Sequence, residues 1–359
     1  MATHGQFDAV VIGAGPAGCM AALGLARRGL SVLLVEKAQR GRWKVCGCCL
    51  GAVGQSALKS AGLERVLDHA GPIDRVTLAA RGATTTLPFQ GFVGISREAL
   101  DTQLVSAAED AGVVARWETA ASADRDGVVT LGDGSTVRTR VVIDASGLRG
   151  HREDHSSIAR SARIGLGLTT HNARCRTKEV TMAVAEGGYL GRVALPDGRV
   201  DFGAAVTPAF VRTHGSATAA LRAIWCESGL DTDEVPDGAW RGTPALTRSR
   251  RAQDGRILRV GDAAGYVEPF TGEGMSWAML AGWHVIDDAI ACIERGPEGS
   301  RWPATIQRLL RVRHARCRLV ATCVRHPSIV AGALRVMSLA PRLSSIGVAA
   351  ASGARGVTA

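Results

Sequence analysis

Residues 7–18 constrain the fold of this chain more than any other segment, because they read as a strand, a glycine-rich turn and the first turn of a helix. Three glycines in this segment form the pattern G-x-G-x-x-G: Gly13, Gly15 and Gly18. The first permits a tight turn, the second lets the backbone approach a pyrophosphate, and the third lets the helix pack against the strand. The segment therefore predicts a dinucleotide-binding turn rather than a glycine-rich turn without a ligand.

Two neighbouring features support this prediction. The helix start at Pro16 and Ala17 directs backbone N–H groups and a partial positive charge at the phosphates. A second apolar run, residues 31–35, ends at Glu36, a carboxylate suited to both hydroxyls of an adenosine ribose. These residues complete a βαβ unit, which leaves open whether the dinucleotide is NAD or FAD.

A segment near the other end of the chain favours FAD. Residues 256–275 read as a strand, then Gly261-Asp262, then a loop that enters a helix. This segment resembles the second FAD fingerprint of the superfamily of p-hydroxybenzoate hydroxylase and geranylgeranyl reductase. The resemblance implies that Asp262 accepts a hydrogen bond from a ribityl hydroxyl. It also implies that the loop and the helix start lie beside the flavin ring: Pro269, Gly272, Gly274 and Met275.

Two further segments resemble the same superfamily. Apolar residues recur at helical spacing after Arg97. Members of the superfamily begin this helix with an Arg or Gln that reaches the FAD, which implies the same contact for Arg97; a solvated arginine at a helix start is the alternative. Residues 140–147 resemble the strand and turn that close the FAD domain near the pyrophosphate. We also expect Lys37, next to Glu36, at the cofactor.

Three cysteines within four residues, 46–49, raise the question of a metal site. We predict no metal, because structural zinc or an iron–sulfur cluster needs a fourth ligand and usually a second paired segment. Related flavoproteins carry K-x-C-G here, against the flavin, which implies that Lys44, Cys46 and Gly47 contact the cofactor. Cys46 serves either as small apolar packing or in catalysis, which would need a lowered thiol pKa. The roles of Cys48 and Cys49 stay open.

The order of these segments predicts an α/β protein with a discontinuous Rossmann-like FAD-binding domain, a β-sheet substrate domain and a helical C-terminal region. We expect the FAD domain in residues 1–72, 96–150 and 255–290, the substrate domain in 73–95 and 151–254, and the C-terminal region in 291–359. A turn at residues 196–199 predicts a hairpin. In the C-terminal region, prolines predict three helix breaks: Pro303, Pro327 and Pro341.

Composition limits where the protein can be located and which partners it can bind. No apolar run is long enough to span a membrane, and the first residues do not resemble a secretory signal. Nine scattered cysteines favour reduced thiols over a disulfide framework, so we expect a cytoplasmic location. The formal net charge is +10, but no recognition motif accompanies it and only 4% of residues are aromatic, which argues against nucleic acid.

The basic residues concentrate in residues 308–318. This stretch is either a solvated helix face or a surface for a partner, which would be anionic lipid or a carrier protein that presents a lipid-like substrate. The first alternative is the simpler one, and the second implies peripheral contact with a membrane. The sequence predicts no oligomeric state.

The resemblance implies an oxidoreductase, and three functions remain open. We favour an NAD(P)H-dependent monooxygenase that hydroxylates an apolar aromatic or polyketide-type substrate. The alternative is a reductase of C=C bonds in prenyl lipids, which the K-x-C-G pattern favours. Prenyl reductases carry an aromatic-rich G-Y-x-W-x-F-P stretch where this chain has residues 187–196, and the loss of its Trp and Phe disfavours the reductase. A non-redox flavin-binding protein is the third alternative.

We expect the substrate pocket between the flavin ring and the sheet of residues 160–210. Its predicted roof lies near Tyr189 and its floor at Cys46 and the loop after Glu268. Because the cofactor carries the chemistry, few side chains need to act on the substrate. We expect catalytic roles for Cys46, for Tyr189, and for Glu268 as a base toward a phenolic or enolic proton.

Overall fold

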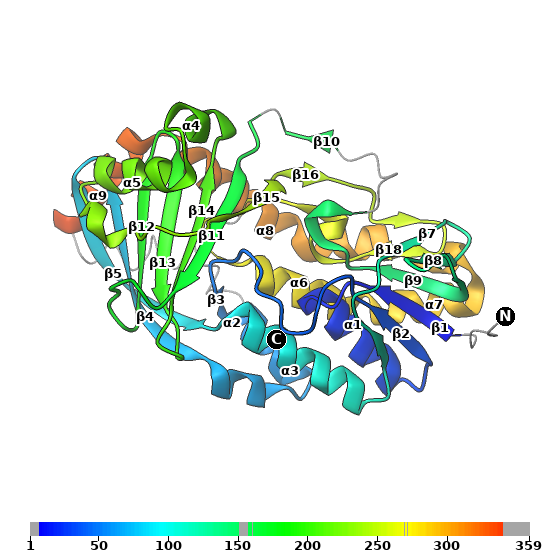
Figure 1. Ribbon diagram of the computed structural model, residues 1–359. Coiled ribbons are helices and arrows are strands. Elements are labelled where there is room, and N and C mark those ends of the chain that lie inside the picture. Colours follow the sequence, from blue (N-terminus) through cyan, green and yellow to red (C-terminus); the bar gives the residue numbers. More distant parts are fainter. Residues whose placement is uncertain (1–6, 151–156, 160, 269, 271, 340–359) are drawn as a thin grey trace.

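The computed structural model describes residues 7–150, 157–159, 161–268, 270 and 272–339. Two lobes lie side by side in Figure 1, a parallel-sheet lobe that holds the N-terminal strand and a second lobe built on a mostly antiparallel sheet. The predicted α/β class is confirmed. Within these residues, no helix is both long and apolar enough to cross a bilayer.

The sheet of the first lobe has the order β17-β18-β9-β1-β2-β6, with the hairpin β7–β8 joined to β9. All neighbours from β18 to β6 are parallel. Continuous apolar runs form the central strands, as parallel strands covered on both faces require. The strands are β1 (Phe7–Ile12), β2 (Val32–Val35), β6 (Val114–Arg116), β7 (Ala121–Ala123), β8 (Val128–Leu131), β9 (Thr136–Asp144), β17 (Gln253–Asp254) and β18 (Ile257–Arg259).

The sheet of the second lobe is mostly antiparallel and has the order β15-β11-β14-β13-β12-β4-β5-β3. The predicted turn at residues 196–199 joins β13 to β14, and this hairpin is confirmed. β3 pairs with β5, so part of the range 1–72 expected in the FAD domain belongs to this sheet. The strands are β3 (Cys49–Leu50), β4 (Gly71–Ala80), β5 (Ala83–Gly94), β11 (Ile164–Thr170), β12 (Glu179–Ala185), β13 (Gly188–Ala194), β14 (Val200–Val206) and β15 (Arg241–Ala245).

Side chains alternate across this second sheet, as the pleat requires. One face carries Leu190 and Phe202, which pack with Trp225 of α5. The other face carries Tyr189, which packs with Leu334 of α9 at one end of the sheet. The sheet therefore has one face covered by a helix and one face turned partly toward the first lobe. A small third sheet joins the lobes: β10 (Ser157–Ile158), β16 (Arg248–Ser249) and β19 (Gly265–Tyr266).

The helices are α1 (Pro16–Arg27), α2 (Ala52–Ser60), α3 (Arg97–Asp110), α4 (Pro208–Thr213), α5 (Ala217–Glu227), α6 (Gly274–His284), α7 (Ile286–Arg295), α8 (Trp302–Val324) and α9 (Pro327–Leu339). Short 3-10 turns complete the described residues: η1 (Glu64–His69), η2 (Gly147–Arg149), η3 (Thr232–Glu234), η4 (Gly261–Ala264) and η5 (Pro297–Gly299).

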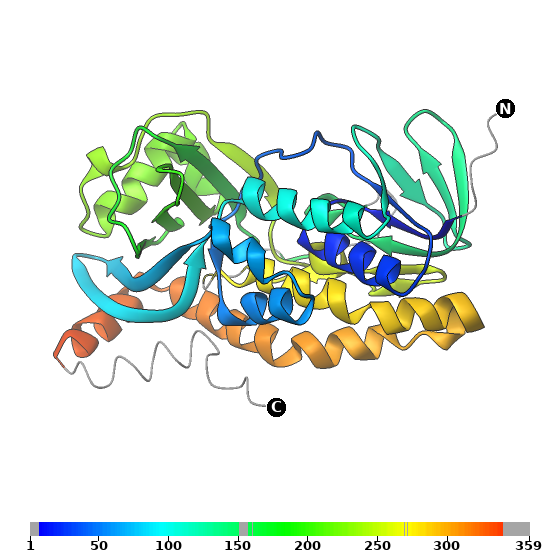
Figure 2. The same ribbon diagram turned by 90° about the horizontal axis from the view of Figure 1, so that it is seen from below.

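α7, α8 and α9 run along one side of the molecule from the first lobe to the second (Figure 2). Pro303 lies in the first turn of α8 and Pro327 begins α9, where a missing backbone N–H costs no helical hydrogen bond. The third predicted break, Pro341, lies outside the described residues. The Trp302 indole is fully buried and donates to the Arg259 carbonyl oxygen at 2.7 Å, which fixes the start of α8 against β18.

Candidate functional site

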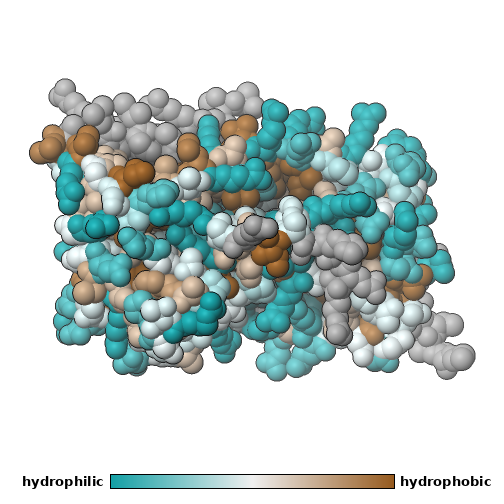
Figure 3. All heavy atoms as spheres, turned by 90° about the horizontal axis from the view of Figure 1, so that it is seen from above, coloured by the Kyte–Doolittle hydropathy of each residue, from teal (hydrophilic) through white to brown (hydrophobic). Residues whose placement is uncertain are grey.

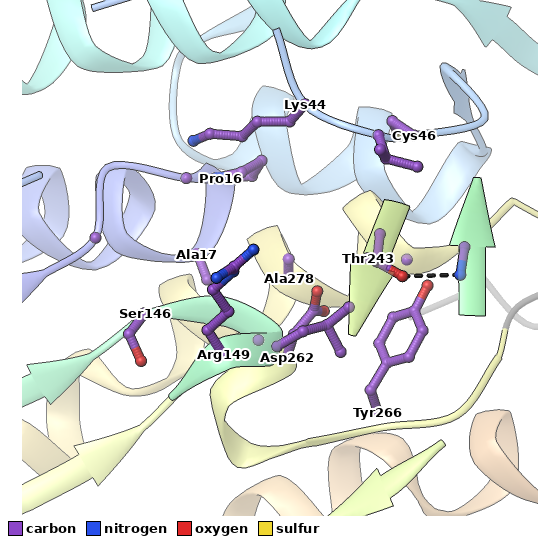
Figure 4. Close-up of a pocket in the computed structure, with 18 of the residues that line it drawn as sticks. Pro16, Ala17, Lys44, Cys46, Ser146, Arg149, Thr243, Asp262, Tyr266 and Ala278 are labelled. Atoms are coloured by element: carbon purple, nitrogen blue, oxygen red, sulfur yellow. Dashed lines mark hydrogen bonds between the residues drawn. The ribbon is translucent and has the colours of Figure 1, made fainter. Parts of the chain in front are cut away.

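A cavity of about 1690 Å³ lies where the two lobes meet. Its walls include the start of α1, the loop before β3, strands β12 to β14, and the start of α6. In Figure 4, Lys44 lies over Pro16 on one side of the cavity, and Asp262 lies near Ala278 across from them. The cavity therefore joins residues from the two ends of the described chain.

The predicted cofactor residues converge on this cavity. Of those that the structure describes, every one except Gly18 lines it: Gly13, Gly15, Pro16, Ala17, Glu36, Lys37, Lys44, Cys46, Gly47, Arg97, Gly261, Asp262, Gly272, Gly274 and Met275. Pro269 lies outside the described residues. Direct contact of each residue with a cofactor stays a prediction.

The three glycines of the fingerprint have separate structural roles. Gly13 has a φ of +105°, and a Cβ there would meet the Ala145 carbonyl oxygen. A Cβ on Gly18 would meet the Gly13 carbonyl oxygen, so this glycine lets the helix lie close to the turn. A Cβ on Gly15 would meet only the Arg97 guanidinium, at 3.7 Å. Gly15 therefore leaves backbone open to the cavity, where a pyrophosphate fits.

Glu36 closes the turn from the side of β2. Its Oε2 accepts from the backbone N–H of Ala14 at 2.9 Å, and its Oε1 accepts from that of Ala38 at 3.0 Å. The Lys44 Nζ lies 4.0 Å from Oε2. The carboxylate is nearly buried and lines the cavity, so it is held in place for the hydroxyls of a ribose.

Arg97 is not a solvated arginine. Its guanidinium donates to both carboxylate oxygens of Asp101, at 3.0 and 2.8 Å, and Lys44 donates to the same carboxylate at 3.2 Å. Asp101 is buried and faces this pair from one helical turn further along α3. One buried carboxylate thus orients two cations at the cavity, which suits an anionic pyrophosphate.

Asp262 follows Gly261 in η4, on the opposite wall. Gly261 has a φ of +58°, and a Cβ added to it would lie 3.0 Å from the Cβ of Ala17. The turn therefore packs closely against the start of α1. Burial raises the pKa of the Asp262 carboxyl to about 6. The Asp262 carboxyl can still hydrogen-bond a ribityl hydroxyl, because such a contact does not require the carboxyl to be fully ionised. The open backbone at Gly15, the fixed Glu36 carboxylate and Asp262 together fit FAD.

Cys46 lines the cavity from the loop that joins β2 to β3. The backbone N–H of Cys48 donates to the Cys46 sulfur at 3.4 Å. Hydrogen bonding from the Cys48 thiol, which outweighs burial, lowers the pKa of Cys46 below its ordinary value. Cys46 therefore has the lowered pKa that a catalytic thiol needs. Burial raises the pKa of Cys49 and also contributes to a raised pKa at Cys48, after hydrogen bonding to Cys46.

Asp201 is a cavity residue that the sequence analysis missed. It lies on β14, is 1% exposed, and its Oδ1 accepts from the Thr169 hydroxyl at 2.6 Å. The same hydroxyl accepts from the Trp43 indole at 2.6 Å. Burial raises the pKa of the Asp201 carboxyl to about 8, so it is mostly protonated at neutral pH. The sequence signal that could have identified Asp201 is its position as a polar residue within the otherwise largely apolar strand of residues 199–206.

A row of glycines beside Asp201 was also missed. Gly167, Gly203 and Gly191 face one another across β11, β14 and β13. A Cβ on Gly203 would lie 3.1 Å from the Cys46 carbonyl oxygen and from Gly47 Cα. The loop that carries Cys46 therefore lies directly on the backbone of the sheet, and this contact places Cys46 near Asp201.

Tyr189 and Glu268 have different positions relative to the cavity. Tyr189 lines it and packs edge-on against Phe270, with 4.9 Å between ring centroids. Glu268 is 1% exposed, does not line the cavity, and accepts from the Arg163 guanidinium at 3.1 Å. Arg163 also lies 5.7 Å from the Tyr189 ring centroid. This geometry makes Glu268 part of a buried ion pair behind Tyr189, and its role as a base stays a prediction.

Among the residues that the structure describes, no group of three or more His, Cys, Asp or Glu side chains could hold a metal ion.

Comparisons with known proteins show which families this chain resembles. A family model described as lycopene cyclase protein matches residues 8–174. Digeranylgeranylglycerophospholipid reductase 2 of Methanothermobacter thermautotrophicus is 30% identical over 325 residues, which cover 83% of this chain and 81% of the relative. Menaquinone reductase of Mycolicibacterium smegmatis is 28% identical over 306 residues, 77% of this chain and 74% of the relative.

A solved structure of PqsL, a probable FAD-dependent monooxygenase from Pseudomonas aeruginosa, shares the fold. Its TM-score is 0.68 at 20% identity, covering 91% of this chain and 99% of that one. The fold and the cavity define an FAD-dependent oxidoreductase. The chain belongs to the superfamily of p-hydroxybenzoate hydroxylase and geranylgeranyl reductase, as its sequence predicted.

Proposed function

We propose that this protein reduces C=C bonds in a long-chain isoprenoid lipid, with FAD as cofactor and NAD(P)H as the electron donor. The curated relatives named above are reductases of a digeranylgeranyl lipid and of menaquinone, and they match about four fifths of the chain. This similarity outweighs the loss of the aromatic-rich stretch at residues 187–196, which had favoured a monooxygenase.

The observation that carries the proposal is the pair of protonatable groups, Cys46 and Asp201, in a cavity with apolar walls. Reducing a C=C bond takes up two electrons and two protons. When bound, FAD supplies the electrons. Asp201 holds a proton at neutral pH, and the lowered pKa of Cys46 lets this thiol release a proton more readily than an ordinary cysteine. The walls beyond them suit a hydrocarbon chain: Val76, Leu78, Val180, Met182, Leu246, Phe270 and Val320.

The protein's own side chains then have distinct tasks. Lys44 and Arg97 orient the cofactor phosphates, and the apolar walls exclude water from the reacting bond. Tyr189 and Phe270 close the cavity beside the α8 helix. Asp201 donates a proton to the substrate carbon, and the Thr169 hydroxyl holds the carboxyl in place.

An anaerobic mixing experiment tests the proposal. The purified protein is loaded with FAD, reduced without oxygen and mixed with a geranylgeranyl lipid that carries no quinone. Return of the oxidised flavin absorbance, together with a product heavier by two hydrogens, supports the reductase. The matched control is the saturated form of the same lipid, which should leave the flavin reduced.

A monooxygenase is the second candidate, and the fold shared with PqsL supports it. In a monooxygenase, the alkene would not reoxidise the reduced flavin when oxygen is absent. When O2 is present, one of its oxygen atoms would be added to the substrate. Asp201→Asn and Cys46→Ala separate the two further. Both variants should keep FAD, and in the reductase both should slow the anaerobic reaction.

A further inference from the structure

The net positive charge of this chain comes from its C-terminal part. After Glu298 the sequence has no Asp, Glu or Lys and ten arginines, from Arg301 to Arg355. These ten equal the whole formal net charge of +10, so the preceding residues are balanced. A segregation of charge on this scale points to an anionic partner.

The described part of this region is α8 and α9. Exposed arginines lie along the outer face of α8: Arg308, Arg311, Arg316 and Arg318. Large apolar side chains are exposed between them, with Val312 at 54% and Leu319 at 67%. On α9, Ile329 is 59% exposed and Val336 58%. Within the described residues, seven large apolar side chains are exposed, and five lie on these two helices.

The spacing of these side chains places them in stripes. Val312 and Leu319 are seven residues apart, which is two helical turns, and so are Ile329 and Val336. The opposite faces of both helices are buried: Leu310 and Cys317 pack on the first lobe, and Ala331 and Leu334 pack on the second sheet. The two helices are thus anchored by one face and carry arginines and aliphatic side chains on the other.

We propose that the outer faces of α8 and α9 dock on a membrane that contains anionic lipids. Arginines would bind lipid phosphates while the aliphatic side chains between them enter the headgroup region, as in interfacial amphipathic helices. Charge complementarity selects this partner, because a second copy of this chain would bring the same arginines face to face. On the face in Figure 3, hydrophilic side chains predominate and hydrophobic ones form small separate groups.

The docking surface is close to the cavity. Val320, on the same helix as Leu319, lines the cavity wall, and Val324 packs in one cluster with Tyr189. A lipid substrate could therefore pass from the membrane to the cavity alongside α8. This consequence rests on the proposed function, whereas the docking itself does not.

Vesicle sedimentation with the full FAD-loaded chain tests the proposal. The probes are vesicles of phosphatidylcholine alone and of equimolar phosphatidylcholine and phosphatidylglycerol. The protein should bind the anionic vesicles, release them as salt rises, and bind the neutral vesicles at least tenfold more weakly. Arg311→Gln with Arg316→Gln should weaken binding by roughly tenfold or more.

Leu319→Glu with Val336→Glu should abolish binding while the flavin content stays unchanged. The matched control is Val114→Glu, because Val114 is 49% exposed on β6 of the first lobe, away from α8. Equal binding to both kinds of vesicle, or an equal loss in the control, would overturn the proposal. So would a change from dimer to monomer in Leu319→Glu without vesicle binding, because the surface would then bind a second copy. Failure of the reductase assay would leave these results unaffected.

Discussion

The buried pair of Arg163 and Glu268 gives the sharpest test of how this site is built. The side chains are 2% and 1% exposed, and Nη1 lies 3.1 Å from Oε1. Removing one partner of such a pair leaves an uncompensated buried charge and costs about 3–5 kcal/mol. Arg163→Met should therefore lower the free energy of unfolding by that amount, and the apparent Tm by roughly 6–10 °C at about 2 °C per kcal/mol.

The double variant Arg163→Met with Glu268→Leu removes both charges at once. It should recover most of the lost stability, because well-packed apolar side chains often replace a buried pair without cost. The assay is thermal unfolding followed by release of flavin fluorescence, with Arg28→Met as a control at an exposed ion pair. A loss below about 1 kcal/mol in Arg163→Met, or a double variant no more stable than it, would refute this reasoning.

A further variant of this pair, Glu268→Gln, decides the role of Glu268. If the carboxylate only supports Tyr189, Glu268→Gln should lower the Tm while turnover at low temperature changes little. If it is the predicted base, turnover should collapse even where the variant is folded and loaded with FAD. The two outcomes are separated by measuring kcat and flavin content on the same preparation.

Three further predictions concern the cavity. Gly15→Val should lose FAD while the fold is kept, because its side chain would occupy the space that Gly15 opens; a flavin spectrum like that of the wild type would contradict this. Gly203→Ala should shift the loop that carries Cys46, because its Cβ would lie 3.1 Å from two backbone atoms, and overpacking of this kind costs about 1–3 kcal/mol. Activity should fall by at least threefold, whereas the control Gly332→Ala on α9, whose Cβ would meet no atom within 4 Å, should leave it unchanged. Burial raises the pKa of Asp201 from its ordinary 3.8 to about 8, so its contribution to stability is complete below pH 3.8 and is lost as the pH rises through about 8. Asp201→Asn should flatten this fall in urea unfolding curves, and an unchanged slope between pH 4 and pH 8 would show that the carboxyl is not buried in solution.

The sequence predicted those parts of the fold that local patterns determine. Glycine spacing and apolar runs located β1, α1 and β2, and helical periodicity located α3. The alternating segments and the turn at residues 196–199 predicted the strands of the second sheet. In each case the signal lies within about twenty residues, where propensity and periodicity are informative.

The sequence could not predict contacts between distant residues. Arg163 and Glu268 lie 105 positions apart, so nothing local marks the pairing that buries Glu268. The glycine row needs the register of three strands, and only that register shows that the loop with Cys46 rests on it. Asp201 was missed for the same reason, because its burial depends on Trp43 and Thr169 from other segments.

The order in which the parallel strands occur in the sequence also affects how the protein folds while it is being synthesised. β9 ends at Asp144, but its neighbour β18 does not begin until Ile257. At about 5–20 residues per second, the ribosome needs roughly 6–23 s to make the chain between them. During that time, the Val142–Asp144 edge is an open template for other strands. Nascent chains of this protein should therefore depend on chaperones until Ile257 emerges, and the flavin can bind completely only after Asp262 has followed it.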